Sequence, residues 1–263
     1  MTEPVLPTFE GNTCPLPLSH QDSIVIGHGS GGRMTRDLIE RIFQPYLSSP
    51  QLLAGNDFAE VLSANGTAPA RIAISTDSHI VSPLVFPGGD IGRLSVCGTV
   101  NDVAMSGAIP VSLTAGFILE EGLSTGLLES IVKSMAEAAH EAGVQIVAGD
   151  TKVVEKGKAD SLFINTTGIG WIPSGVEING ANAQPGDVVL ISGTLGDHGI
   201  AVLTARGDLG FETAIQSDVA PLNHLIQEIL QAAPHTHVLR DPTRGGLATT
   251  LNEIAGQSKV CIT

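Results

Sequence analysis

Three aspartates in separate parts of the chain are the side chains that best fit a chemical role. Asp77, Asp102 and Asp150 each follow or lie in an apolar segment and are flanked by small residues. Mg²⁺ prefers oxygen ligands and usually binds through a few carboxylates together with the phosphates of a nucleotide. An aspartate after a strand is also a common turn former or helix cap. As a set, the three acids predict metal ligands for a magnesium–nucleotide complex.

Lys152 lies two residues after Asp150 and adds a positive charge to the same segment. A lysine there could contact a phosphate or stabilise a developing oxyanion, although most lysines are simply solvated. Three histidines beside glycine or aspartate loops could act as acids or bases near neutral pH, but a structural role is the simpler interpretation for each. Asp241 and Arg244 are interpreted as structural, pairing with each other or capping the next helix. The histidines are His28, His79 and His198.

A glycine-rich loop follows the short apolar run 23–26 and precedes residues with helical spacing. Its glycines satisfy G-x-G-x-x-G, but the acid expected about 20 residues later at a second strand is missing, which makes dinucleotide binding a distant alternative. Backbone N–H groups of such a loop could still enclose phosphates, and the other alternative is a plain strand-to-helix turn. The predicted cofactor-binding loop is Gly27, His28, Gly29, Ser30, Gly31 and Gly32.

The regular elements needed to position these residues can be read from the hydrophobic pattern. Strands are predicted at 71–75, 111–119, 144–148 and 161–171. Asp90 is a predicted N-cap for a helix to Met105, which places Asp102 near its last turn. Ser124 should cap a second helix that Gly143 ends. Residues 44–70 are mixed and only weakly assignable.

The chain is predicted to form two domains. A turn at 184–187 precedes the apolar run 188–191, which should open a second sheet, with a helix around 222–230 and strands at 238–239 and 259–263. The last strand would begin where the chain ends, so we expect a C-terminally truncated protein. The predicted segments are an irregular arm (1–22), an N-terminal domain that binds ATP and dimerises (23–173), a linker (174–186) and an incomplete C-terminal domain (187–263).

Composition excludes several classes of function. The net charge is −14 and lysine and arginine are not clustered, so nucleic-acid binding is not expected. No basic start with an apolar run and no uncharged stretch of spanning length is present, which favours the cytoplasm and no membrane partner. Three cysteines without C-x-x-C spacing argue against a disulfide framework or a zinc site.

Seven motifs, in order, resemble the HypE family of hydrogenase maturation factors. That family belongs to the ATP-binding superfamily of aminoimidazole ribonucleotide synthetase and selenophosphate synthetase. The resemblance covers residues 23 to the end, and the segments 86–92 and 193–199 favour HypE over its relatives. The motifs are Gly27–Gly32, Ser75–Ser78, Phe86–Gly92, Cys97–Ala104, Gly116–Gly122, Gly149–Val154 and Gly193–Gly199.

The resemblance implies an α+β, two-domain aminoimidazole ribonucleotide synthetase-like fold. Its N-terminal sheet domain forms a homodimer, its C-terminal domain is an α/β sandwich, and ATP binds between them near the dimer interface. It implies Mg²⁺ on the three aspartates and catalytic roles for Lys152 and Asp102. Besides the glycine loop, the residues expected to hold the cofactor are Asp77, Asn101, Asp150 and Thr151.

The resemblance also implies a reaction. In the family, the carbamoyltransferase HypF loads a carbamoyl group on a C-terminal cysteine, and ATP-dependent dehydration gives a thiocyanate whose cyanide passes to iron on HypC–HypD. Transfer of the γ-phosphoryl group to the carbamoyl oxygen makes that oxygen a good leaving group, and loss of an N–H proton then yields the nitrile. The charges that develop are those that Mg²⁺ and a lysine stabilise.

The end of the chain departs from the family pattern. The family tail has the form Pro-Arg-Ile-Cys, whereas this sequence ends Cys261-Ile262-Thr263. Cys261 is not the substrate cysteine, because it lies in a strand pattern with residues after it. We therefore expect no self-dehydration by this chain. Two alternatives are a selenophosphate synthetase-like ATP enzyme, for which a reactive cysteine is missing from the glycine loop, and a dimeric scaffold for maturation partners.

Overall fold

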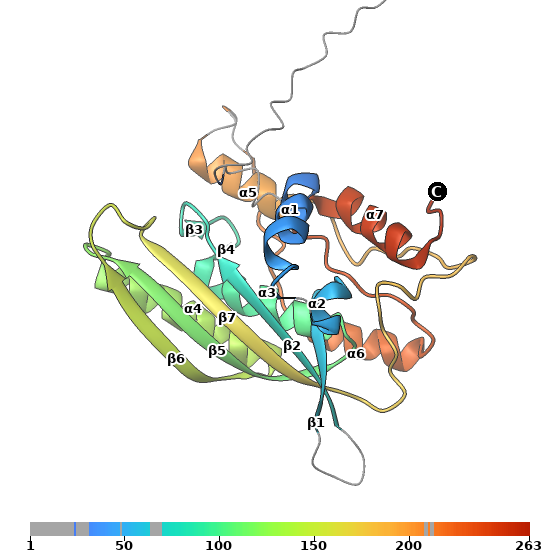
Figure 1. The fold of residues 1–263 in the computed structure, drawn as a ribbon. Coiled ribbons are helices and arrows are strands. Elements are labelled where there is room, and N and C mark those ends of the chain that lie inside the picture. The colour runs from blue at the N-terminus through green and yellow to red at the C-terminus, as the bar shows by residue number, and fades with distance from the viewer. Residues whose placement is uncertain (1–23, 25–31, 48, 64–69, 208–209, 211–212) are drawn as a thin grey trace, which may run out of the picture.

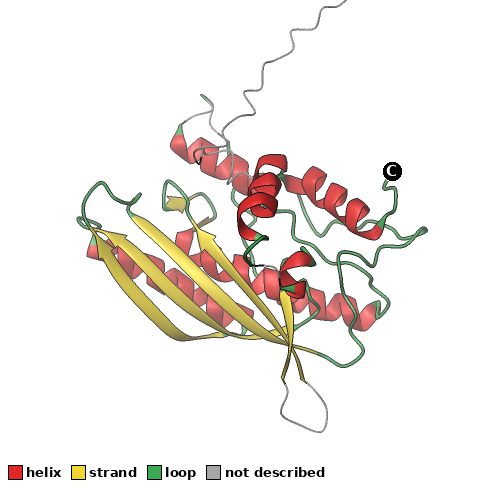
Figure 2. Cartoon of the chain, in the orientation of Figure 1, coloured by secondary structure: helices red, strands yellow, loops and turns green. Residues whose placement is uncertain are grey.

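The computed structural model describes residues 24, 32–47, 49–63, 70–207, 210 and 213–263. One twisted sheet dominates, and the long helices α3 and α4 lie against one of its faces (Figures 1 and 2). The strands are β1 (Ala59–Ser63), β2 (Ala70–His79), β3 (Val85–Phe86), β4 (Gly89–Asp90), β5 (Ile109–Glu120), β6 (Gln145–Val154) and β7 (Leu162–Ile172). The helices are α1 (Arg33–Leu38), the π-helical η2 (Ile39–Phe43), α2 (Pro50–Leu53), α3 (Ile91–Ala104), α4 (Thr125–Ala142), α5 (Asp197–Arg206), α6 (Asn223–Ala232) and α7 (Gly246–Ser258).

The order of strands in the sheet is β1-β2-β7-β5-β6. All neighbours are antiparallel except β5 and β6, which are parallel and connected through α4. Asp77 on β2 pairs with Thr166 on β7, which in turn pairs with Ala115 on β5. Side chains of paired residues share a face of the sheet, so this register decides which functional groups can meet.

The core lies between the sheet and α3 with α4. On β7 every second residue from Leu162 to Ile172 is buried, as expected for a strand with one covered face. Helix α3 carries nine buried residues and touches β2, β5 and β7, so it is central to the fold. Ile91, Val96, Val100, Leu113, Ile131 and Leu162 are among the fully buried side chains of this core.

Local capping residues set the ends of both long helices. The Asp90 carboxylate accepts a hydrogen bond from the Arg93 N–H at 2.9 Å, and Ser124 caps α4 through the Leu127 N–H. Gly143 ends α4 with a φ of 70°, a conformation that costs glycine little. The predictions for these caps, for the four strands and for the position of Asp102 in the last turn of α3 are confirmed. Strand β2 extends beyond the predicted end, so Asp77 lies inside it.

The second half of the chain differs from the prediction. Residues 188–191, 238–239 and 259–263, predicted as strands, have no strand conformation, and the side chains of Val188 and Leu190 are 80% and 89% exposed. A strand needs a hydrogen-bonded neighbour, and the described residues supply none for these runs. The helix predicted around 222–230 is present as α6, whereas α5 was not predicted.

The second half is nevertheless anchored to α3. The Asn101 side chain accepts from the Leu222 N–H at 2.7 Å and donates to the Ala220 carbonyl at 3.1 Å. Arg93 Nε donates to the Val219 carbonyl at 3.2 Å.

Among the described residues, no helix combines the length and hydropathy that crossing a bilayer requires.

The packing of β7 against α3 yields a stability prediction. A Cβ on Gly168 would lie 2.9 Å from both Thr99 Cγ2 and Val103 Cγ2. We expect Gly168→Ala to lower the free energy of unfolding by about 1–3 kcal/mol, the usual cost of overpacking a core. Urea denaturation would measure the change.

Gly116→Ala is the matched control, because a Cβ there meets only the Asn165 carbonyl oxygen, at 3.9 Å. Both glycines are inside strands, so strand propensity affects them alike. Equal stability of the two variants would contradict the packing described for β7 and α3.

Candidate functional site

Asp102 lies in a group of acids where α3, β2 and the segment before β1 meet. The Ser75 hydroxyl is 2.9 Å from Asp102 Oδ2 and 2.8 Å from the carbonyl oxygen of Asp57. Ser75 is 7% exposed, because it lies on the face of β2 that α3 covers. This contact joins the last turn of α3 to the chain at Asp57, which was not a predicted site residue.

A second part of the chain brings Asp241 and two arginines to the same place. Arg240 Nε is 2.9 Å from Asp57 Oδ2, and Arg240 Nη2 is 2.6 Å from Glu253 Oε2 on α7. Asp241 follows and interacts electrostatically with both Asp57 and Asp102. Asp241 and Arg244 do not pair with each other as interpreted from the sequence, because Arg244 binds Asp77 instead.

Burial and mutual repulsion raise the pKa values of these acids. Burial raises the pKa of Asp102 to about 7, the charges of Asp57 and Asp77 add to the rise, and the Ser75 hydrogen bond opposes it. Burial likewise raises the pKa of Asp57 to about 6 against the attraction of Arg240. Burial raises the pKa of Asp241 well above its ordinary value, with Asp102 and Asp57 contributing. We define Asp57, Asp77, Asp102 and Asp241 as the acid cluster.

Asp77 completes the acid cluster from β2. Its Oδ1 accepts from the Ser78 N–H at 2.8 Å and from Arg244 Nη2 at 2.9 Å. Its Oδ2 is 3.7 Å from His79 Nε2. Burial lowers the pKa of His79, with Arg244 contributing and Asp77 opposing, so the ring is neutral at neutral pH and its contact with Asp77 is not an ion pair.

The structure does not bring Asp150 to the acid cluster within one chain. Asp150 is in register with Gly116 and, through Asn165, with Ser78, so it lies on the face of the sheet opposite to Asp77. Three strand spacings separate the two positions, about 14 Å. Asp150 and Lys152 are 68% and 69% exposed and pair with each other at 2.8 Å. Thr151 lies between them on the same exposed strand.

Of the remaining predicted site residues, Asn101 and Gly32 are described by the structure and the others are not. Asn101 uses both its amide oxygen and its amide nitrogen to hold residues 220–222, as described above. Gly32 is described and precedes α1 with a φ of 76°. The rest of the glycine loop, which is Gly27, His28, Gly29, Ser30 and Gly31, lies outside the described residues.

The donor chemistry of the acid cluster fits a hard divalent cation. Several desolvated carboxylates repel one another, and a cation would relieve that repulsion. Across the described ranges, no three His, Cys, Asp or Glu side chains are arranged so that they alone could hold a metal ion. This is compatible with Mg²⁺, which is usually bound by one or two carboxylates together with substrate phosphates.

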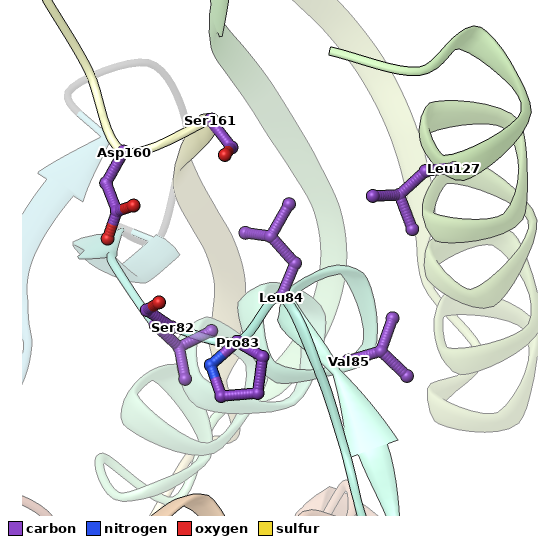
Figure 3. Close-up of a pocket in the computed structure, with 8 residues that line it drawn as sticks. Ser82, Pro83, Leu84, Val85, Leu127, Asp160 and Ser161 are labelled. Atoms are coloured by element: carbon purple, nitrogen blue, oxygen red, sulfur yellow. The ribbon is translucent and has the colours of Figure 1, made fainter. Parts of the chain in front are cut away.

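Two cavities lie near the strand ends. One, of about 250 Å³, is lined by Asp57 of the acid cluster, by Ser75 and Thr76 of β2, and by Asn56 and Phe58. The other, of about 360 Å³, lies beyond the end of β2 between residues 81–85, Leu127 and Ser161 (Figure 3). Asp160 is the only charged residue that lines it. The smaller cavity is therefore the one that a member of the acid cluster, Asp57, lines.

Sequence reasoning missed Asp57 and Asp241. Asp57 lies in the weakly assigned segment 44–70, and Asp241 opens a turn whose aspartate and arginine suggested a local role. Asp57 becomes a site residue only through Arg240 and Ser75, which are distant in sequence. No local pattern distinguishes such an aspartate from a turn former.

Comparison with known proteins now defines the class. The family model of the AIR synthase related protein N-terminal domain matches residues 56–172, and that of the C-terminal domain matches residues 184–263. The chain therefore has the fold of the AIR synthase related proteins, with an N-terminal and a C-terminal domain. This confirms the predicted fold class.

More similar relatives narrow the assignment. Carbamoyl dehydratase HypE of Cupriavidus necator is 56% identical over 90% of this chain and 67% of its own length. A solved HypE–HypF complex matches with a TM-score of 0.78 at 55% identity, covering 84% of this chain and 70% of the other. HypE in complex with ATP matches with a TM-score of 0.69 at 52% identity, covering 90% and 69%. The chain belongs to the HypE family and spans about two thirds of these relatives.

The raised pKa values predict how stability depends on pH. Between pH 4 and about 7 the folded chain retains protons on Asp57, Asp102 and Asp241 that the unfolded chain releases. The contribution of these acids to the free energy of unfolding should therefore fall as pH rises through this range, whereas the lowered pKa values of His79 and His198 act in the opposite direction. Urea denaturation at a series of pH values, without divalent cations, would measure the decline.

Asp102→Asn should flatten this dependence and raise the free energy of unfolding at pH 8 by about 1–3 kcal/mol, allowing for solvent screening of a part-buried carboxyl. Asp160→Asn, which changes an exposed aspartate outside the acid cluster, is the matched control. A pH dependence of the free energy of unfolding that is the same in Asp102→Asn as in wild type would contradict the electrostatics of the cluster.

Proposed function

We propose that this chain is an ATP-dependent carbamoyl dehydratase that converts a cysteine thiocarbamate into a thiocyanate. The observation that carries the proposal is the acid cluster, formed by β2, α3 and residues 240–244 in a chain that belongs to the HypE family. A HypE of this fold has been solved with ATP. Desolvated carboxylates with raised pKa values beside a cavity are typical of a functional site.

Each part of the cluster has a role in this proposal. Asp77 and Asp102 would hold Mg²⁺ together with the phosphates of the nucleotide, whose charge the cation would neutralise. Arg244 is 61% exposed and contacts Asp77, so its guanidinium lies where a phosphate oxygen could be bound. Arg240 and Arg244 pair with acids of the cluster in the described part of the chain. Two positive charges do not balance four carboxylates, which favours binding of a cation together with its nucleotide.

The proposed site takes Asp150 and Lys152 from a second copy of the chain, whereas Thr151 is in register with Phe117 and so lies on the other face of β6. The open face of the sheet carries exposed apolar side chains, including Ile118 and Trp171, and no described helix covers it (Figure 1). An uncovered apolar sheet face indicates an interface. A homodimer through this face would bury these side chains. The two-chain site further requires Lys152 of one chain to reach past the end of the other sheet to Asp77, whose side chain is 29% exposed.

In this arrangement Lys152 would stabilise negative charge on the activated carbamoyl oxygen or on the transferring phosphoryl group. The glycine loop Gly27–Gly32 would enclose the phosphates with its backbone N–H groups. HypF is the proposed donor of the carbamoyl group, because a HypE homologue of this chain has been solved in complex with it. HypC–HypD is the proposed acceptor of the cyanide product for the iron of [NiFe] hydrogenase.

A dehydration assay tests the reaction. The chain would be incubated with Mg²⁺, ATP and a synthetic Pro-Arg-Ile-Cys peptide that carries an S-carbamoyl group. We expect mass spectrometry to show loss of one water from the peptide together with release of ADP, and Asp102→Asn to abolish both. The control peptide ends in serine. If ATP is bound but the S-carbamoyl peptide does not lose water, the proposed reaction is refuted.

Mixing of variants tests the two-chain site. Asp102→Asn and Lys152→Ala should each be inactive alone, because each removes one contribution to every site. Coexpressed, the two variants should regain about a quarter of the wild-type activity per chain, since half of the dimers are mixed and each mixed dimer has one intact site. Lack of recovery in mixed dimers, verified by a tag on each variant, would show that Lys152 acts within its own chain.

A further inference from the structure

Arg244 holds a position that a cation bound to Asp77 would need. Its Nη2 donates to Asp77 Oδ1 at 2.9 Å, and Asp77 is its only hydrogen-bonding partner among the described residues. It also interacts electrostatically with Asp102. The positive charge of Arg244 therefore acts on both carboxylates that are proposed to hold Mg²⁺.

The two carboxylate oxygens of Asp77 differ in their environment. Oδ2 faces the interior, because it is 3.7 Å from Nε2 of the buried His79 and a Cβ on Gly98 of α3 would also lie 3.7 Å from it. Oδ1 accepts hydrogen bonds from the Ser78 N–H and from Arg244. A carboxylate oxygen has about two acceptor sites, so these two donors fill Oδ1. A cation that approaches Asp77 from solvent therefore meets an oxygen that Arg244 already occupies.

Of the two donors on Oδ1, only the guanidinium can leave. The Ser78 N–H belongs to the backbone of β2 and is held by the strand. The Arg244 side chain is 61% exposed, and an ion pair at such a position is screened by solvent. Release into water would cost the guanidinium its only partner in the described structure, whereas a phosphate offers oxygens that match its planar set of donors. Displacement of Arg244 is therefore easier when the cation arrives together with a nucleotide.

We propose that Arg244 couples the binding of the cation to that of the nucleotide, because it occupies Asp77 until a nucleotide phosphate takes its place as partner. This inference rests on the proposed metal–nucleotide site. The guanidinium competes with a bare divalent cation for Asp77 Oδ1, and it binds a phosphate oxygen once the cation has replaced it there. Arg244 thus favours the cation–nucleotide complex over either ligand alone. Such coupling is reciprocal, so each ligand strengthens the binding of the other.

The test replaces Arg244 with glutamine, which removes the charge and keeps a polar side chain. Electron paramagnetic resonance of the free ion measures the affinity for Mn²⁺ alone, and the fluorescence of mant-ATP, with and without Mn²⁺, measures the affinity for the nucleotide. We expect Arg244→Gln to lower the dissociation constant of Mn²⁺ alone about fivefold, because the competing ion pair is gone. We expect the dissociation constant of mant-ATP with Mn²⁺ to rise about tenfold, because a charged contact to phosphate is lost.

Two controls separate this contact from long-range electrostatics, since loss of any nearby positive charge attracts a cation. Lys133→Gln removes one charge from the exposed surface of α4 and should leave both dissociation constants unchanged. In 1 M KCl, where the Debye length is about 3 Å, the gain in Mn²⁺ affinity of Arg244→Gln should persist, because Arg244 is 2.9 Å from Asp77.

The outcomes separate the two proposals. If wild type binds mant-ATP neither with nor without Mn²⁺, the proposed metal–nucleotide site fails. If wild type binds it and Arg244→Gln does not bind Mn²⁺ alone more tightly, the coupling role is overturned while the site stands. A gain that disappears in 1 M KCl also overturns it, as does an unchanged affinity of the variant for mant-ATP with Mn²⁺. Should Arg244→Gln not fold, Arg244→Ala takes its place with the same expected results.

Discussion

The constraint on which the rest of the structure depends is the close approach of several carboxylates at a part-buried site. Asp57, Asp102 and Asp241 reach this place from a segment before β1, from α3 and from the segment before α7, and burial raises the pKa of each. Such a group lowers stability unless neighbouring charges or protons compensate. Arg240, which is 11% exposed, connects Asp57 to Glu253 and so provides the fixed compensation. The position of α7 relative to the segment before β1 is therefore coupled to the charge of the acid cluster.

The two faces of the sheet have different surroundings. One face packs on α3 and α4 and holds Ser75, Asp77 and His79 in alternate positions of β2. The other face presents Asp150 and Lys152 with the exposed Ile118 and Trp171. Because a strand alternates its side chains, one chain cannot direct both sets to a single point. The proposed site uses both sets and would therefore need the sheet of a second chain.

The sequence predicted what local interactions determine. Asp90, Ser124 and Gly143 act on helix ends within a few residues of themselves, so composition and spacing were sufficient to identify them. Strands were predicted correctly where a neighbour exists and incorrectly at 188–191, where the apolar pattern is present but no described strand pairs with it. Asp57 and Asp241 could not be assigned, because their environment is created by Arg240, Ser75 and one another. The position of Asp150 depends on the register of three strand pairs, which hydrophobic periodicity does not encode.

The two arginines of the site differ in a way that bears on how a cation could enter. Arg240 is 11% exposed and has carboxylate partners on both Asp57 and Glu253, so moving it would leave two part-buried charges without a partner. Arg244 is 61% exposed and contacts only Asp77 among the acids of the cluster. Its ion pair is screened by solvent and is weak by comparison. Asp77 is therefore the acid whose counter-charge can be exchanged at the lowest cost in free energy, while the Ser78 N–H keeps its hydrogen bond to Oδ1.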